Sequence, residues 1–263
     1  MDLGLNGRTA LVGGASAGLG RACAERLASE GCRLVLWSRG GDALELAAQE
    51  IRDAHKVDVT TVSGDATDPA TAAKVAVAAR KALGKVEIVV LNAGGPPPVE
   101  STQTDPAVWR RSFQLLAITP IELTTLLLPS MRARGFGRVV SILSSGIRQP
   151  IPELSYSNAC RSALAAWLKT ISVEVMPDGV TVNGVLPGRL DTKRIASLDL
   201  ARAERSGTTQ EAVRAEYSLG IPAGRYGDPD ELAAYVAWLC SDRARYQTGT
   251  FVPIDGGSFR ALP

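Results

Sequence analysis

The feature that most constrains this sequence is a glycine-rich turn between an apolar run and an amphipathic stretch. Residues 13–20 have the sequence GGASAGLG; they follow the apolar run Thr9 to Val12, and apolar residues recur at helical spacing over 21–29. Glycines let the backbone turn tightly and approach a phosphate closely, and the first turn of a helix presents free N–H groups to an anion. The turn therefore predicts a nucleotide site, although the pattern also occurs as a purely structural turn, so the rest of the chain must decide.

Composition limits the class of protein and of partner. The 263 residues, 45% hydrophobic and 21% charged, suffice for one large α/β domain with a single core. The 29 basic and 27 acidic residues are spread along the chain and leave a formal net charge of +2. This balance argues against nucleic acid or an anionic membrane as partner and favours a small molecule.

The cysteines and the single histidine argue against several kinds of site. Cys23, Cys32, Cys160 and Cys240 lack paired or metal-ligand spacing, and His55 is the only histidine, so we expect no metal site and no Ser-His-Asp triad. The first residues, MDLGLNGR, have no apolar signal core, and no apolar run approaches about 18 residues. We therefore expect reduced thiols, no membrane span and a cytoplasmic protein.

Strand-like and helix-like segments alternate along the whole chain. We expect strands over 9–12, 33–37, 57–63, 86–91, 138–143, 180–186 and 251–254, and helices over 21–29, 42–53, 69–83, 105–134, 154–175 and 228–241. This alternation predicts an α/β fold with a single domain over 1–263, a Rossmann-type, doubly wound parallel sheet of about seven strands. Pro120 and Pro129 are expected to kink or divide the longest helix. Residues 190–226 lack the alternation and are expected to form an irregular lid over the substrate.

Polar and small residues follow several strands, at the edge where such a sheet binds ligands. Arg39 follows the second strand and would attract the 2′-phosphate of NADP(H), whereas an acidic residue would bind the free hydroxyl of NAD(H); an ordinary solvated arginine is the alternative. Asp65 follows the third strand and either accepts from the adenine amino group or caps a turn. Asn92, Ala93 and Gly94 follow the fourth strand and let a cofactor lie against the backbone.

Taken together, these motifs resemble the short-chain dehydrogenase/reductase family over about residues 7–257. The resemblance is carried by Gly14, Gly18 and Gly20 in a GxxxGxG turn, Asp65, Asn92-Ala93-Gly94, Ser144, Val182-Asn183, Pro187-Gly188, Thr192, Gly224-Arg225 and Asp255-Gly256-Gly257. It implies a nicotinamide cofactor, with NADP(H) favoured over NAD(H) by Arg39, a small-molecule carbonyl substrate, and a homo-oligomer of four or two subunits. The cofactor-binding residues that it implies are Gly14, Ser16, Ala17, Gly18, Leu19, Gly20, Arg39, Asp65, Ala66, Asn92, Ala93, Gly94, Arg161, Pro187, Gly188, Leu190 and Thr192.

The chain departs from this family at the catalytic positions. Family members use a serine to hold the carbonyl, a tyrosine to pass the proton and a lysine four residues later, and the lysine is missing here. If Tyr156 were the tyrosine, Cys160 would take the lysine position. The small residues, leucine and glutamate that follow instead favour a register with Arg161 in place of the lysine and Ser157 in place of the tyrosine. Ser157 then comes thirteen residues after Ser144, the usual spacing in the family.

These replacements change the expected chemistry. Arg161 can hydrogen-bond ribose hydroxyls but stays protonated, and Ser157 is too weak an acid to donate a proton near neutral pH without help. Leu116 stands where the family has an asparagine that anchors a water molecule. Tyr156 is either packed or a proton donor, and the geometry of its helix distinguishes the two. The candidate catalytic residues are therefore Ser144, Ser157, Tyr156 and Arg161.

Three functions stay open. We favour an NADPH-dependent reductase of a ketone or quinone-like small molecule with a non-standard proton path. The second is a catalytically silent NADP(H)-binding regulator, and the third is a non-redox lyase or isomerase on the same fold. Arg148 and Arg189 each follow a ligand-edge strand; they either orient an anionic or phenolic substrate or are ordinary surface arginines.

Overall fold

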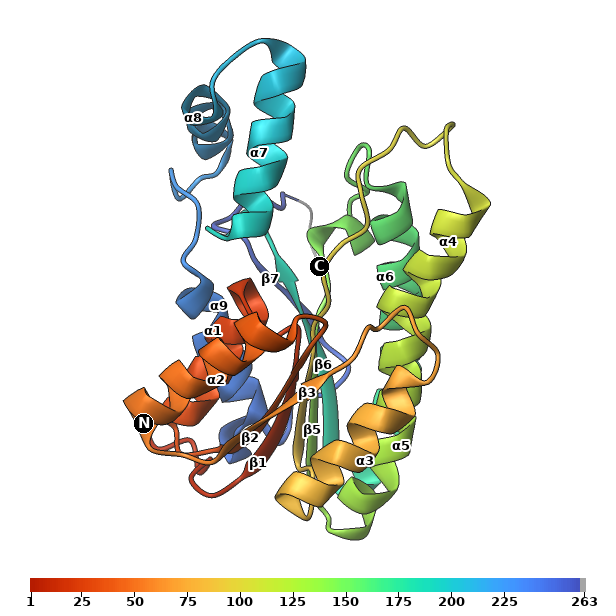
Figure 1. Cartoon of the computed structure of the whole chain (residues 1–263), viewed down its shortest axis with the longest axis vertical. Helices are drawn as coiled ribbons and strands as arrows, with labels where there is room; N and C mark the ends of the chain where they lie inside the picture. The colour runs from red at the N-terminus through yellow and green to blue at the C-terminus, as the bar shows by residue number, and fades with distance from the viewer. Residues whose placement is uncertain (261–263) are drawn as a thin grey trace.

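The computed structural model describes residues 1–260 and contains a seven-stranded sheet between two layers of helices (Figure 1). The strands are β1 (Thr9–Gly13), β2 (Arg33–Ser38), β3 (Val59–Ser63), β4 (Ile88–Leu91), β5 (Gly137–Ile142), β6 (Val180–Pro187) and β7 (Phe251–Ile254). Their order is β3-β2-β1-β4-β5-β6-β7, and every neighbouring pair is parallel. The predicted Rossmann-type sheet is confirmed, and its order reverses between β1 and β4, where such folds bind ligands.

The helices cover both faces of the sheet. They are α1 (Gly18–Ser29), α2 (Gly41–His55), α3 (Thr71–Leu83), α4 (Pro106–Phe113), α5 (Thr119–Ala133), α6 (Ser155–Val175), α7 (Lys193–Ser206), α8 (Gln210–Gly220) and α9 (Pro229–Cys240). On one face α1 contacts α2 and α9, and on the other α5 contacts α3 and α6 (Figure 1). α7 and α8 pack on each other beyond the carboxyl ends of the strands.

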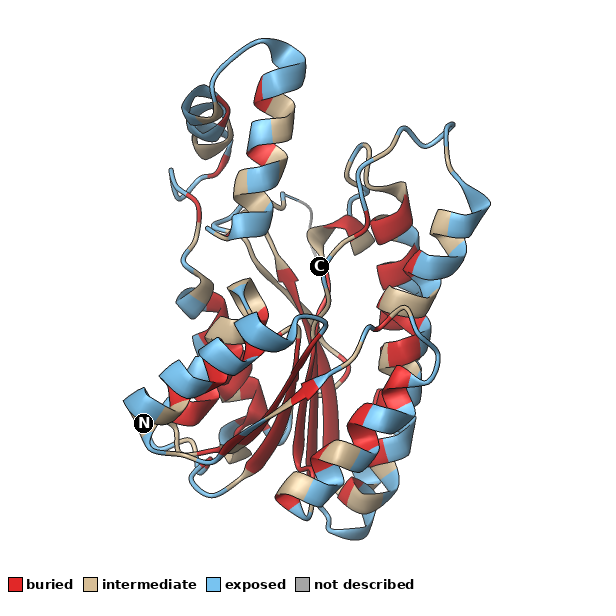
Figure 2. Cartoon of the chain, in the orientation of Figure 1, coloured by how far each residue is buried: buried red, intermediate tan, exposed pale blue. Residues whose placement is uncertain are grey.

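The strands are buried and separate two apolar cores (Figure 2). Successive side chains alternate between the faces, so Val12 and Leu34 pack in the core with α1 and α9, while Leu11 and Val35 pack in the core with α3 and α6. All residues of β1 and of β5 are buried. This burial explains the continuous apolar runs in the sequence, because a central parallel strand is covered on both faces.

Residues 190–226 differ from the irregular segment expected from the sequence, because they contain the helices α7 and α8. The side chains of Thr192 and Thr209 cap the two helices, and Gly207, with a φ of 64°, ends the first. Few residues of either helix are buried, and both helices are rich in polar and charged residues, so they lack the apolar content that marks the core helices. The expectation of a segment without regular structure is therefore wrong.

The expected break in the longest helical segment is present, and a π-helical turn (Gln114–Ile118) makes it. Pro120 follows this turn directly, in a helix that continues from Pro106 to Ala133, and its missing N–H interrupts the helical hydrogen bonds there; Pro129 lies further inside α5. Contrary to the sequence expectation, Pro106–Ala133 is long and apolar enough to cross a membrane by length and composition. Of the residues in its most apolar 18-residue window, 44% are buried inside the protein. The core helix of a soluble protein can be equally long and apolar, so this is weak evidence for a membrane span.

Candidate active site

The glycine-rich turn joins β1 to α1 and leaves its backbone open to a ligand. Gly14 and Gly18 each have a φ of 59°, in the left-handed region that favours glycine. A Cβ on Gly20 would overlap the carbonyl oxygens of Gly13 and Gly14. The Nδ2 of Asn92, beyond the end of β4, donates to the Gly13 carbonyl at 3.3 Å. This turn fits the pyrophosphate of a dinucleotide, because its glycines allow a tight bend against Asn92 and the helix N-terminus attracts an anion.

Two residues predicted to contact the adenosine half lie at the ends of β2 and β3. Arg39 is exposed, and its guanidinium makes no ion pair with the carboxylates of residues 1–260. The Oδ1 of Asp65 accepts the backbone N–H of Thr67 at 2.9 Å. Asp65 therefore caps a turn, one of the two roles weighed for it, and its contact with adenine stays a prediction.

The loop after β6 lies against the glycine-rich turn. A Cβ on Gly18 would come within 3.7 Å of Thr192 Cγ2. The backbone N–H of Gly188 donates to the Ile254 carbonyl at 2.9 Å, which holds the start of this loop beside β7. The fold thus brings three predicted cofactor segments, 14–20, 92–94 and 187–192, to the same edge of the sheet.

Gly13 and Trp37 are paired neighbours in β1 and β2. A Cβ on Gly13 would lie 2.9 Å from the Asn92 carbonyl oxygen and 3.4 Å from Trp37 Cε3. The Nε1 of Trp37 donates to the Gly64 carbonyl at 2.9 Å. The indole therefore lies beside the glycine-rich turn and joins β2 to the loop after β3.

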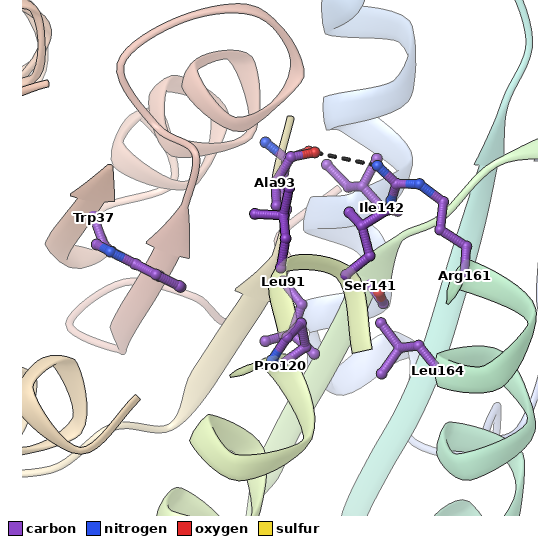
Figure 3. A pocket seen from close by; sticks show the side chains of 11 residues that line it. Trp37, Leu91, Ala93, Pro120, Ser141, Ile142, Arg161 and Leu164 are labelled. Atoms are coloured by element: carbon purple, nitrogen blue, oxygen red, sulfur yellow. Dashed lines mark hydrogen bonds between the residues drawn. The ribbon is translucent and has the colours of Figure 1, made fainter. Parts of the chain in front are cut away.

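Arg161 extends from α6 to the ends of β4 and β5 (Figure 3). Its Nη1 donates to the Ile142 carbonyl at 2.8 Å, its Nη2 to the Ala93 carbonyl at 3.2 Å, and its Nε to Ser157 Oγ at 3.3 Å. Ser157 and Arg161 are each 9% exposed. Ser157 and Arg161 are one helical turn apart and lie on the same face of α6, toward the ends of β4 and β5.

The charge of Arg161 is buried without a carboxylate partner. Burial lowers its pKa to about 10, the neighbouring Cys160 opposes this shift, and the charge of Arg194 adds to it. Within residues 1–260 no acidic side chain forms an ion pair with Arg161. Backbone carbonyls therefore solvate the guanidinium, which is protonated at neutral pH and does not exchange its proton with a substrate.

Tyr156 faces α4. Its hydroxyl oxygen accepts the backbone N–H of Asp105 at 2.7 Å, and its ring packs edge-on against Trp109 with centroids 4.7 Å apart. The residue is 2% exposed. Of the two roles weighed for Tyr156, the geometry supports packing, because the side chain is buried against α4 with its hydroxyl at the start of that helix, whereas Ser157 and Arg161 lie at the strand ends.

Ser144 follows β5 and begins a short 3-10 turn (Ser145–Ile147). Its Oγ accepts the backbone N–H of Gly146 at 3.0 Å, so its own proton is available to a substrate. Asn158, the residue after Ser157, packs against this turn: a Cβ on Gly146 would overlap its Oδ1, which is buried with no partner among residues 1–260. No motif in the sequence marks Asn158, because the contact joins α6 to a turn that only the fold brings near.

A small cavity lies beside Arg161 (Figure 3). Its volume is about 20 Å³, room for one water molecule. Leu116 and Leu164 form part of an otherwise largely apolar wall, and Ser141 Oγ in that wall is buried without a hydrogen-bond partner in the described chain. Leu116 brings no polar group to this cavity, whose polar side chains are Ser141, Asn92 and Arg161.

The two arginines weighed as substrate ligands are engaged elsewhere. Arg148 Nη2 donates to the Phe251 carbonyl at 3.2 Å, and Arg189 forms an ion pair at 2.7 Å with Asp199, which is buried. Arg194, which the sequence did not single out, instead donates from α7 to the Pro96 carbonyl at 2.9 Å, in the loop after β4. Only the fold shows that this basic residue lies at the ligand edge.

The whole chain has similar proteins of known structure or activity. A family model described as enoyl-(acyl carrier protein) reductase matches residues 14–258. The structure of L-sorbose reductase from Gluconobacter frateurii, complexed with NADPH and L-sorbose, has a TM-score of 0.95 and 31% identity, covering 100% of both chains. NADPH-dependent reductase BacG of Bacillus subtilis is 28% identical over 97% of this chain and 99% of its own length. The 3-oxoacyl-(acyl-carrier-protein) reductase FabG of Escherichia coli is 31% identical over 98% of this chain and 99% of its own length.

Proposed function

Because this chain belongs to the short-chain dehydrogenase/reductase family, we propose that it reduces the carbonyl group of a ketone with NADPH. The NADPH named for the similar reductases supports this cofactor, as does Arg39, an exposed cation at the end of β2 that can pair with a 2′-phosphate. When bound, NADPH supplies a hydride to the carbonyl carbon. The protein must then hold the carbonyl oxygen and let it receive a proton.

The cofactor is proposed to lie along the carboxyl ends of β1, β2, β4 and β6. The glycine-rich turn, the exposed Arg39 and the small residues after β4 are the features that fit it. The residues assigned to it are Gly14, Ser16, Ala17, Gly18, Leu19, Gly20, Arg39, Asp65, Ala66, Asn92, Ala93, Gly94, Arg161, Pro187, Gly188, Leu190 and Thr192.

Ser144 and Ser157 are proposed to donate hydrogen bonds to the carbonyl oxygen. The observation that carries this assignment is the contact of Arg161 Nε with Ser157 Oγ at 3.3 Å. Because Arg161 occupies an acceptor position of that oxygen, the proton of Ser157 is directed to another acceptor. The backbone N–H of Gly146 acts on Ser144 in the same way.

The proton that completes the reduction is proposed to come from solvent water. Arg161 keeps its proton at neutral pH, and the hydroxyl of Tyr156 is buried at the start of α4. A serine holds a developing oxyanion but is a poor acid, so the site favours electron-poor ketones and quinones, whose reduced oxygens are easier to protonate. A lid over such a substrate is proposed for residues 190–226, which contain α7 and α8.

NADPH oxidation over a panel of ketones and quinones tests this function. Ser144→Ala should lower kcat/KM about a hundredfold, the usual effect of removing one oxyanion donor, and leave NADPH affinity unchanged. Ser145→Ala is the matched control, because it changes the next serine of the same turn and should leave kcat/KM nearly unchanged. Equal effects of the two substitutions would contradict the assignment.

A silent NADP(H)-binding protein is the second candidate. It is favoured by the observation that neither Arg161 nor Tyr156 is arranged to pass a proton. Tight NADPH binding with no turnover on any ketone or quinone of the panel would select this candidate over the reductase.

A further inference from the structure

The acidic side chains around the ligand edge are already engaged. Asp191, just before α7, forms an ion pair with Arg214 at 2.7 Å, and Glu153, before α6, pairs with Arg205 at 2.8 Å. Asp105 caps α4. None of these carboxylates is therefore free to pair with another basic side chain at this edge of the sheet.

Arg194 of α7 lacks such a partner. Its Nη2 donates to the Pro96 carbonyl at 2.9 Å, and within residues 1–260 it forms no ion pair. Four other arginines of α7, α8 and the preceding loop do have acidic partners: Arg189, Arg202, Arg205 and Arg214. Arg194 thus differs from its neighbours, because a neutral carbonyl is all that the described chain offers its charge.

Arg194 and Arg161 approach the same loop from different helices. Arg161 donates to Ala93 and Arg194 to Pro96, three residues further on. In Figure 1 the loop after β4 runs between α6 and α7, from which these two side chains come. Both guanidiniums therefore contact the loop after β4, close enough for the charge of Arg194 to act on Arg161.

The positive charges of Arg161 and Arg194 repel each other. Burial lowers the pKa of Arg194 as well as that of Arg161, and the charge of Arg194 lowers the pKa of Arg161 further. An anion bound between the helices would reverse this effect, since it favours the charged form of both groups. A neutral substrate would leave both cations uncompensated.

We propose that the substrate is an oxo acid, a ketone that also carries a carboxylate, and that Arg194 binds the carboxylate while Ser144 and Ser157 hold the ketone. This inference rests on the proposed function, because it names the substrate class of the same site. The competing role for Arg194 is a contact with the cofactor pyrophosphate, since Thr192, two residues earlier, lies near the glycine-rich turn.

The first test compares each acid with its amide, which has nearly the same shape but no charge. Pyruvate, acetoacetate and 4-oxopentanoate, each with its amide, place the carboxylate at increasing distance from the ketone. For at least one pair the acid should have a kcat/KM at least about tenfold higher than the amide, the effect of a charge-assisted hydrogen bond. Arg194→Gln should remove that preference, Arg194→Lys should keep part of it, and Lys193→Gln, an equal loss of charge on the same turn, should leave it unchanged.

The second test measures binding without turnover, so that it stands apart from the proposed reductase. Calorimetry on the NADPH-loaded protein compares the corresponding hydroxy acids with their amides: lactate, 3-hydroxybutanoate and 4-hydroxypentanoate. Acid-selective binding that Arg194→Gln abolishes would uphold the inference even if no ketone were reduced, in which case the proposed function alone would fail. The inference would be overturned if neither test showed acid selectivity. It would also be overturned if Arg194→Gln lowered the affinity for NADPH but kept the acid selectivity.

Discussion

Replacing Ser157 by tyrosine and Arg161 by lysine together should give the site a working general acid. Burial lowers the pKa of Arg161 from its ordinary value to about 10, which corresponds to about 3 kcal/mol against the charged form. A lysine begins about two units lower than arginine, so the same burial brings it into the range where it exchanges protons near neutral pH. A positioned general acid contributes about 10²- to 10⁴-fold, and we expect kcat/KM for a neutral ketone to rise within this range.

The assay is NADPH oxidation as a function of pH, with NADPH affinity measured in parallel. The double variant should show a pH dependence near neutrality that the parent lacks, because Arg161 stays protonated there. Ser157→Tyr alone keeps the guanidinium, and Arg161→Lys alone has no phenol, so each single variant should gain less than about tenfold. A double variant that folds and binds NADPH but reduces the ketone no faster than the parent would refute the register that places Ser157 and Arg161 at the catalytic positions.

Three further outcomes follow from contacts described above or from a buried carboxylate. Arg39→Ala should weaken NADPH binding at least about tenfold and leave NADH binding unchanged, as measured by tryptophan fluorescence; equal losses would remove the 2′-phosphate argument. Tyr156→Phe should keep turnover and lower the free energy of unfolding in urea by about 1 kcal/mol, because the Asp105 N–H loses its acceptor. Glu87 is buried, which by itself raises its pKa, but donors from Lys85, Arg8 and Thr9 bring the pKa below its ordinary value. Glu87 therefore stabilises the fold at pH values above its unfolded pKa of about 4.5, and this stabilisation is lost as the pH falls through its lower folded pKa. Urea titrations at several pH values should show a smaller loss of unfolding free energy at acid pH in Glu87→Gln; the same loss as in the parent would contradict this prediction.

The sheet could be predicted because its strands are buried on both faces. Such strands give continuous apolar runs, and the glycine-rich turn after β1 fixed the kind of α/β fold. α7 and α8 could not be found by the same means, because they bury few apolar residues. Their capping threonines, Thr192 and Thr209, and the glycine at 207 were the available signals, and they mark only the ends of helices that are mostly polar.

The catalytic helix was predictable only in part. The pattern of residues after Arg161 indicated which face of the helix carries it, but its contacts go to backbone carbonyls, which no side-chain motif records. The role of Tyr156 depended on Asp105, which is 51 residues away in the chain. The position of Arg194 likewise depends on how α7 meets the loop after β4, a contact between segments 98 residues apart.

The packing around Gly13 also limits how much side chain the end of β1 can carry. A Cβ at residue 13 would lie 2.9 Å from the Asn92 backbone oxygen and 3.4 Å from the indole of Trp37. The first of these distances is a clash with a backbone atom, so a side chain here would require β1 and the end of β4 to move apart. Gly13 therefore keeps these two strands close together at the point where the order of the sheet reverses.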